Sequence, residues 1–164
     1  MIQFVVFDVA TGAVLRWGQC QADMLENQAN EGERALATND MTVAGNRVLV
    51  WEQVKAKREE RLAAGALTPF GLVQTDPVSR GYVTGLVTRA LIAEVNAEEG
   101  FSRTFTTAAN TSVTLNAAQI IALGALVEEY VNDCHERSQA LRADIDAASD
   151  MAGLLAIDIT VGWP

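Results

Sequence analysis

Histidine, cysteine and aromatic residues are scarce in this sequence. Its 164 residues include one histidine, two cysteines and 6 % aromatics. A structural zinc site needs several converging Cys and His ligands, and Cys20 and Cys134 stand in no CxxC or Cys/His pattern. We therefore expect no metal and no cofactor. The spacing leaves a disulfide between the two cysteines open, but two lone cysteines fit a reducing compartment better.

Basic residues are also few. Twelve Lys and Arg oppose 21 Asp and Glu, which gives a formal net charge of −9. The negative potential of such a chain repels the phosphate backbone of a nucleic acid unless a local basic patch outweighs it. The densest basic stretch, Lys55 to Arg61, is interleaved with glutamates and is typical of a solvated helix face. We therefore expect no nucleic-acid partner.

Long hydrophobic runs are absent as well. No segment reaches the roughly 18 uninterrupted apolar residues that a spanning helix needs, and Ala117 to Val127 is too short. Met1 to Phe7 has neither the basic start nor the apolar length of a signal peptide. These features predict no membrane insertion and synthesis in the cytoplasm.

The sequence offers no recognisable active site. It contains no GxGxxG, GxxxxGK[ST], GxSxG or HExxH motif. The single histidine, His135, adjoins Cys134, but neighbouring residues on a helix point about 100° apart and do not face each other. Acid pairs such as Glu98-Glu99 have nothing beside them that would raise a carboxyl pKa for acid–base catalysis. We therefore expect a protein that is not an enzyme and has no catalytic residue.

The first fifty residues contain the signals of short strands. Ile2 to Phe7 is a run of β-branched and aromatic residues, Asp8 to Gly12 predicts a turn, and Ala13 to Gly18 predicts the returning strand. Ala22 to Asn30 has short helical character.

Two further strand signals follow. Glu33 to Thr38 reads as another strand, and Met41 to Val50 predicts a second hairpin-like unit around Ala44-Gly45-Asn46. We expect residues 1–50 to form a β-rich docking module.

The periodicity becomes helical at Trp51. Trp51, Val54, Arg58 and Leu62 recur at helical spacing, and Gly65 stands where that helix would end. Ala66 to Gln74 reads as a loop or short extended piece. Asp76 is then placed as the N-cap of a helix that starts at Pro77 and ends near Gly100.

The remainder predicts one hairpin and one long helix. Phe101 to Leu115 alternates as two strands, and Asn116 with Gln119 forms a capping box. The helix that follows would be on the order of 50 Å long at about 1.5 Å per residue. A short helix or turn and an apolar tail from Ile157 to Pro164 close the chain. The predicted class is α+β, with a helical domain over residues 51–164.

The long helix carries an apolar line with two interpretations. Ile120, Val127, Cys134, Leu141 and Ala148 recur every seventh residue, as in a coiled coil. The same line equally fits an amphipathic helix that docks on its own domain. The interface candidates on this helix are Ile120, Val127, Tyr130, Leu141 and Ile145. Trp17 in the N-terminal hairpin and Trp163 in the C-terminal tail are further interface candidates.

The order and spacing of several landmarks carry a family resemblance. They are Trp51, Val54, Arg58, Thr75-Asp76, the 101–113 hairpin, the Leu115 to Gln119 helix start, Cys134, Ile145, Ala147-Ala148, Leu155, Ile157-Asp158 and Trp163-Pro164. Residues 51–164 thereby resemble a domain of unknown function found in tailed-bacteriophage tail-fibre and tail-tip proteins. Residues 1–50, with Thr11-Gly12, Gly18-Gln19-Cys20 and Gln28 to Glu33, resemble the N-terminal segments of small phage tail proteins.

The resemblance implies a structural part of a virion tail: tip, fibre or baseplate. Its partners would be other phage tail proteins and further copies of itself, three being favoured by fibre symmetry. The family pattern supplies no catalytic residue. A tail-fibre assembly chaperone that is not retained in the virion is the alternative, and an enzyme acting on surface glycans is a third hypothesis that rests only on the abundant carboxylates.

Overall fold

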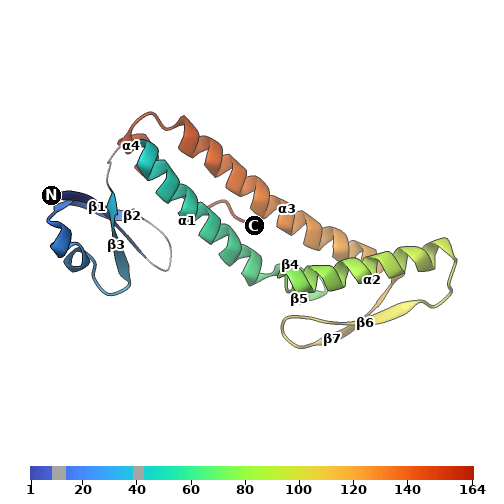
Figure 1. The fold of residues 1–164 in the computed structure, drawn as a ribbon. Coiled ribbons are helices and arrows are strands. Elements are labelled where there is room, and N and C mark those ends of the chain that lie inside the picture. Colours follow the sequence, from blue (N-terminus) through green and yellow to red (C-terminus); the bar gives the residue numbers. More distant parts are fainter. Residues whose placement is uncertain (9–13, 39–42) are drawn as a thin grey trace. The chain divides into compact units, whose positions relative to one another are not determined.

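The computed structural model describes residues 1–8, 14–38 and 43–164, and the expected α+β class is confirmed. The chain packs as two compact units. The first unit contains Met1–Glu59 and Glu136–Trp163, and the second contains Glu60–His135 with Pro164. Helices α1 (Val43–Ala64) and α3 (Ala117–Ala147) each contribute to both units (Figure 1).

The first unit begins with a three-stranded antiparallel sheet. Its strands are β1 (Ile2–Asp8), β2 (Val14–Cys20) and β3 (Glu33–Thr38), in the order β2-β1-β3. Phe4, Val5 and Val6 of the central strand are buried although successive side chains point to opposite faces, so both faces of β1 are covered. The predicted strands are confirmed here, whereas the predicted turn at Asp8 to Gly12 falls almost wholly outside the described residues.

The segment between β2 and β3 forms two short 3₁₀ turns. They are η1 (Ala22–Met24) and η2 (Glu26–Gln28), which confirms the short helical character expected from Ala22 to Asn30.

The hairpin predicted from Met41 to Val50 is wrong. The described part of that segment is the first part of α1, and Gly45 lies inside the helix. Asn46, Val50 and Val54 are buried at four-residue intervals, and Val50 and Val54 share a core with Leu141 and Ile145 of α3. Packing of this face outweighs the turn propensity of Ala44-Gly45-Asn46. The proposed domain boundary between residues 50 and 51 consequently lies inside α1, and the division at that point stays a prediction.

The core of the first unit joins the two helices to the C-terminal segment. Leu154 of α4 (Met151–Leu155) and Ile159 pack with Val50, Val54, Leu141 and Ile145. The Arg47 guanidinium donates to the Ala148 carbonyl at 2.5 Å, and the Arg142 guanidinium lies 5.0 Å from the ring centre of Trp51. The Leu154 and Ile159 packing and the Arg47 hydrogen bond hold the segment after α3 against the helices, and the Arg142–Trp51 contact joins α3 to α1.

The second unit contains two hairpins and helix α2 (Pro77–Val95). Strands β4 (Ala66–Thr68) and β5 (Gly71–Val73) pair where a loop or short extended piece was expected. Gly65 ends α1 with a φ of 89°, as predicted. Strands β6 (Ser102–Thr106) and β7 (Ser112–Asn116) form the expected second hairpin.

Local capping fixes the starts of α2 and α3. The Asp76 carboxylate accepts hydrogen bonds from the backbone N–H groups of Val78 at 2.9 Å and Ser79 at 3.1 Å. Asn116 and Gln119 exchange the two reciprocal bonds of a capping box, at 2.9 and 3.0 Å. Both predicted caps are confirmed, although α2 ends at Val95 rather than near Gly100.

The core of the second unit lies between α2, α3 and the two hairpins. Its buried members are Ala66, Val73, Val83, Leu86, Ala90, Phe105, Leu115, Ala117, Ile120, Leu123 and Val127. Helix α3 approaches α2 closely at Gly124, where a Cβ atom would stand 2.3 Å from Cγ2 of Val87. No side chain larger than hydrogen fits at this crossing without a shift.

Candidate interaction surfaces

The apolar line of α3 is internal. Ile120 and Val127 are buried in the core of the second unit, and Leu141 and Ile145 are buried in the core of the first. Of the two interpretations of this line, docking on the chain's own units is the one observed. These four side chains are therefore not available at the surface. Replacing Val127 or Leu141 with Glu would bury a charge and destabilise the fold, so such variants do not test self-association.

Tyr130 and Trp163 are half-buried and hydrogen-bonded within the chain. The Tyr130 hydroxyl donates to the Arg61 carbonyl at 2.5 Å, and burial raises the pKa of this phenol. The Trp163 indole N–H donates to the Ile159 carbonyl at 2.9 Å. The hydroxyl and the indole N–H thus form hydrogen bonds within their own units. Only the exposed part of each ring could contact a partner protein.

Trp17 is the predicted interface residue that remains largely at the surface. It lies on β2, an edge strand of the sheet, and is 54 % exposed. Trp17 also lines a small cavity together with Val5, Leu49 and Leu154. The neighbouring Leu15 is 47 % exposed, so β2 presents two large apolar side chains.

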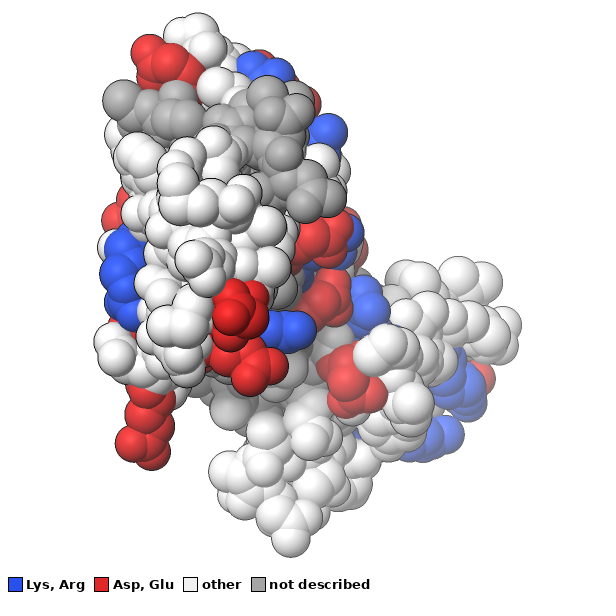
Figure 2. All heavy atoms as spheres, turned by 60° about the vertical axis from the view of Figure 1, so that its left-hand side comes forward, with Lys and Arg blue, Asp and Glu red and all other residues white. Residues whose placement is uncertain are grey.

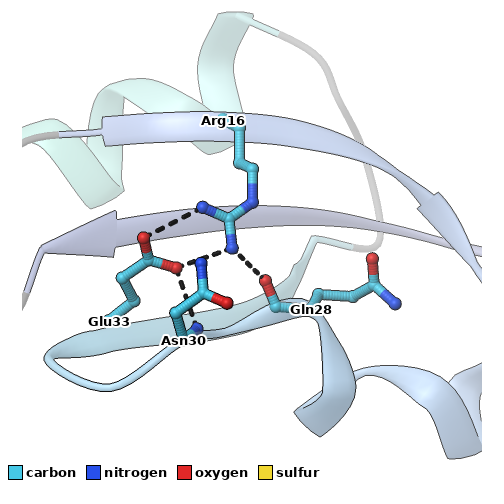
Figure 3. A network of polar contacts seen from close by, with 4 residues as sticks. All are labelled: Arg16, Gln28, Asn30 and Glu33. Atoms are coloured by element: carbon cyan, nitrogen blue, oxygen red, sulfur yellow. Dashed lines mark hydrogen bonds and ion pairs between the residues drawn. The ribbon is translucent and has the colours of Figure 1, made fainter.

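An ion pair fixes the segment that connects β2 to β3 (Figure 3). Arg16 donates from Nη1 to Glu33 Oε1 at 3.0 Å and from Nη2 to Glu33 Oε2 at 2.6 Å. The same Nη2 donates to the Gln28 carbonyl, and the Asn30 N–H donates to Glu33 at 2.9 Å. The Arg16 hydrogen bond, helped by the Asn30 N–H, lowers the pKa of Glu33 to about 2. The network ties two strands and the loop between them.

The second unit has a surface groove between α2 and α3. Its volume is about 620 Å³, within the usual range for ligand sites. Arg80, Thr84 and Thr88 line it from α2, and Glu128 and His135 line it from α3. The groove therefore contains both charge signs and two hydroxyl groups.

The candidates for metal and thiol chemistry do not converge. Among residues 1–8, 14–38 and 43–164 there is no group of three or more His, Cys, Asp and Glu side chains that could hold a metal ion. Cys20 and Cys134 are both free thiols, so the disulfide left open by the sequence does not form. In the described part of the chain, no helix is both long enough and apolar enough to cross a membrane.

Charge is dispersed over the face shown in Figure 2. Acidic and basic side chains are interspersed there, with wide uncharged areas between them. Some opposite charges in the described residues form local ion pairs, such as Lys55 with Glu52 at 2.7 Å and Arg142 with Asp146 at 3.0 Å. On the visible described surface, the basic side chains do not merge into one large patch.

Sequence reasoning missed the outer face of α2. Val78 is 82 % exposed and Val95 is 86 % exposed, and Tyr82, Leu91 and Ile92 are about half exposed. The available signal was the charge content of the helix, which is limited to Arg80, Arg89 and Glu94 in its 19 residues. A surface helix normally has a charged face opposite its buried one.

The fold and these surfaces define a small α+β protein with two hydrophobic cores and exposed apolar side chains on β2 and α2. The chain belongs to a family described as a domain of unknown function, DUF4376, whose model matches residues 46–161. The match starts inside α1 and ends in the C-terminal tail. Comparisons with curated proteins and with solved structures gave no match.

Proposed function

We propose that the protein is a non-catalytic structural component of a bacteriophage tail, in the tip, fibre or baseplate region. It would act in the virion through contacts with other tail proteins and with copies of itself. The landmarks shared with phage tail domains support the phage assignment. The exposed edge strand β2 is the structural observation that carries the contact role.

Strand β2 contains neither Lys nor Pro, the residues that often protect a sheet edge, although its pairing with β1 shifts register between Val6 and Phe7. Edge strands are usually blunted by Lys, Pro or a short length, because their unpaired backbone groups can accept a further strand. The sequence Val14 to Cys20 contains neither Lys nor Pro, and Arg16, its only charged residue, is engaged by Glu33. With Leu15 and Trp17 half exposed beside this edge, β2 suits a partner strand that pairs along it and covers both side chains.

The test is a double substitution, Leu15→Lys with Trp17→Lys, in a phage that carries the gene. Two lysines blunt the edge and remove the apolar contacts, so we expect incorporation into virions to fall by roughly tenfold or more. Mass spectrometry of purified virions measures the copy number. The control is Leu67→Lys, which places one lysine at an 85 % exposed apolar strand position of the second unit.

Three results are informative. A fixed copy number for the wild type, lost only in the double variant, supports the proposal. A protein that is required for tail formation but absent from virions would instead be an assembly chaperone. Normal incorporation of the double variant would show that β2 is not the contact strand.

A further inference from the structure

The outer face of α2 is an uncharged seam that runs the length of the helix. Its members recur alternately three and four residues apart: Val78, Gly81, Gly85, Thr88, Ile92 and Val95. All six are exposed, whereas Val83, Leu86, Ala90 and Ala93 on the opposite face are buried in the core. Alternating three- and four-residue spacing is the pattern by which one helix packs along another. We call these six residues the α2 seam.

The two glycines of the α2 seam are not required by close packing against the described residues of their own chain. A Cβ atom at Gly81 or Gly85 would meet nothing within 4 Å. Glycine inside a helix costs about 1 kcal/mol relative to alanine, and at Gly124 the close approach of Val87 accounts for it. At Gly81 and Gly85 no contact with the described residues accounts for the glycine, so these two positions form an open notch in the helix surface.

The α2 seam is self-complementary in the antiparallel direction. If a second α2 runs antiparallel to the first, Gly81 faces Ile92 and Gly85 faces Thr88, while Val78 faces Val95. Ile92 of each copy then lies beside Gly81 of the other, and Thr88 lies beside Gly85. Val78 and Val95 contact each other at the two ends of the seam. The twofold axis repeats each of these contacts. A parallel pair would leave a gap between the glycines, crowd Ile92 against itself, and align the two helix dipoles unfavourably.

The polar and charged groups of α2 are compatible with this contact. The Thr88 hydroxyl donates to the Thr84 carbonyl at 2.9 Å, so it needs no partner from the second helix. The helix carries two Arg and one Glu, a net charge of +1 in a chain of −9. Repulsion between two acidic copies is therefore weaker at this helix than over the rest of the surface.

We propose that the α2 seam is a self-association site that pairs antiparallel with the α2 seam of a second copy. The proposal rests on the self-association included in the proposed function, and it places that contact on α2 rather than on the buried line of α3. Twofold pairing makes a dimer, in contrast to the three copies that fibre symmetry favours.

The size of the seam sets the expected strength. A 19-residue helix is about 28 Å long, and a strip of this length about 10 Å wide covers roughly 300 Å² per copy. Stable complexes bury about 800 Å² per partner. We therefore expect a weak, reversible dimer whose dissociation constant lies above the micromolar range of standard-sized interfaces.

The test is sedimentation equilibrium of the purified full chain between about 10 µM and 1 mM, a concentration range suited to weak association. Gly85→Leu fills the notch and also raises intrinsic helix propensity, so the substitution favours the helical state of α2. Ile92→Lys places a charge in the seam. Each should weaken association by roughly tenfold or more. Val48→Lys, at a 60 % exposed position of α1, is the matched control and should associate like the wild type.

Cross-linking tests the direction in a background where Cys20 is replaced by Ser. A mixture of the Val78→Cys and Val95→Cys chains should form a disulfide between the two variants, whereas neither variant alone should cross-link with itself. A wild type that stays monomeric throughout, a trimer, or self-cross-linking of Val78→Cys would each overturn the proposal. Because these measurements use the purified chain, they are independent of whether the protein is present in virions.

Discussion

At the scale of single residues, the Arg16–Glu33 pair differs from an ordinary surface ion pair. It is bidentate, and its partners are joined to the backbone of the connecting loop by further hydrogen bonds to Gln28 and Asn30. Isolated exposed pairs contribute little because holding two long side chains costs entropy. Here the Glu33 carboxylate and the Arg16 guanidinium bond to each other and to the connecting loop. One ion pair therefore links β2, β3 and the loop between them.

The lowered pKa of Glu33 predicts an acid-sensitive loop. A depressed folded-state pKa stabilises the fold above the ordinary glutamate pKa of about 4.3, and this contribution is lost as the pH falls toward about 2. We expect Glu33→Gln to lower stability at neutral pH and to flatten the decline between about pH 4.5 and pH 2.

Urea unfolding at stepped pH, followed by circular dichroism, measures this dependence. Glu31→Gln is the control, because this neighbouring carboxylate is exposed and has no ion pair among the described residues. Identical pH profiles for wild type and Glu33→Gln would contradict the expectation.

At the scale of elements, α2 and α3 each contain a glycine, but only the glycine of α3 is needed for close helix packing. Gly124 of α3 lets Val87 of α2 approach, whereas Gly81 of α2 faces open space. The same substitution therefore tests packing at one position and intrinsic propensity at the other. Sequence alone gives no way to tell the two glycines apart.

We predict that Gly124→Ala destabilises the protein by about 1–3 kcal/mol, because the added methyl group overpacks a closed helix crossing. Gly81→Ala should stabilise it by up to about 1 kcal/mol through helix propensity. Thermal or urea unfolding at a concentration where the chain is monomeric compares the two variants. A neutral Gly124→Ala would show that α2 and α3 separate easily at this crossing.

At the scale of the whole molecule, two cores stabilise two compact units. Leu123 lies in the core of the second unit and Leu141 in that of the first, although both belong to α3. We expect Leu123→Ala and Leu141→Ala each to cost about 2–5 kcal/mol as cavity-forming substitutions. Each should reduce hydrogen-exchange protection first within its own unit.

Hydrogen exchange with peptide-level resolution checks this expectation. In Leu141→Ala, protection should fall first around Val50, Val54 and Leu154, and in Leu123→Ala first around α2 and β7. Equal loss across both units in either variant would mean that the units unfold together.

Much of the fold was predictable because its signals are local. The Asp76 cap, the capping box at Asn116 and the hairpin between β6 and β7 depend on residues a few positions apart. The surfaces were harder to predict. Trp17 was expected at the surface and is exposed, and its contact role stays a prediction. Ile120, Val127, Leu141 and Ile145 were candidates for an interface, but they are buried in the chain's own cores.

The sequence by itself determined the α+β class, the starts of α2 and α3, and the absence of known catalytic motifs. Only the tertiary structure decided that Asn46 and Val50 belong to a helix, that the apolar line of α3 faces inward, and that the outer face of α2 is uncovered. The physical reason is that caps and turns are satisfied by near neighbours in the chain. Whether an apolar position lies in the core or at the surface depends instead on which distant element packs against it. Val87 of α2 packs against Gly124 of α3, for example, whereas no described residue packs against Gly81 of α2.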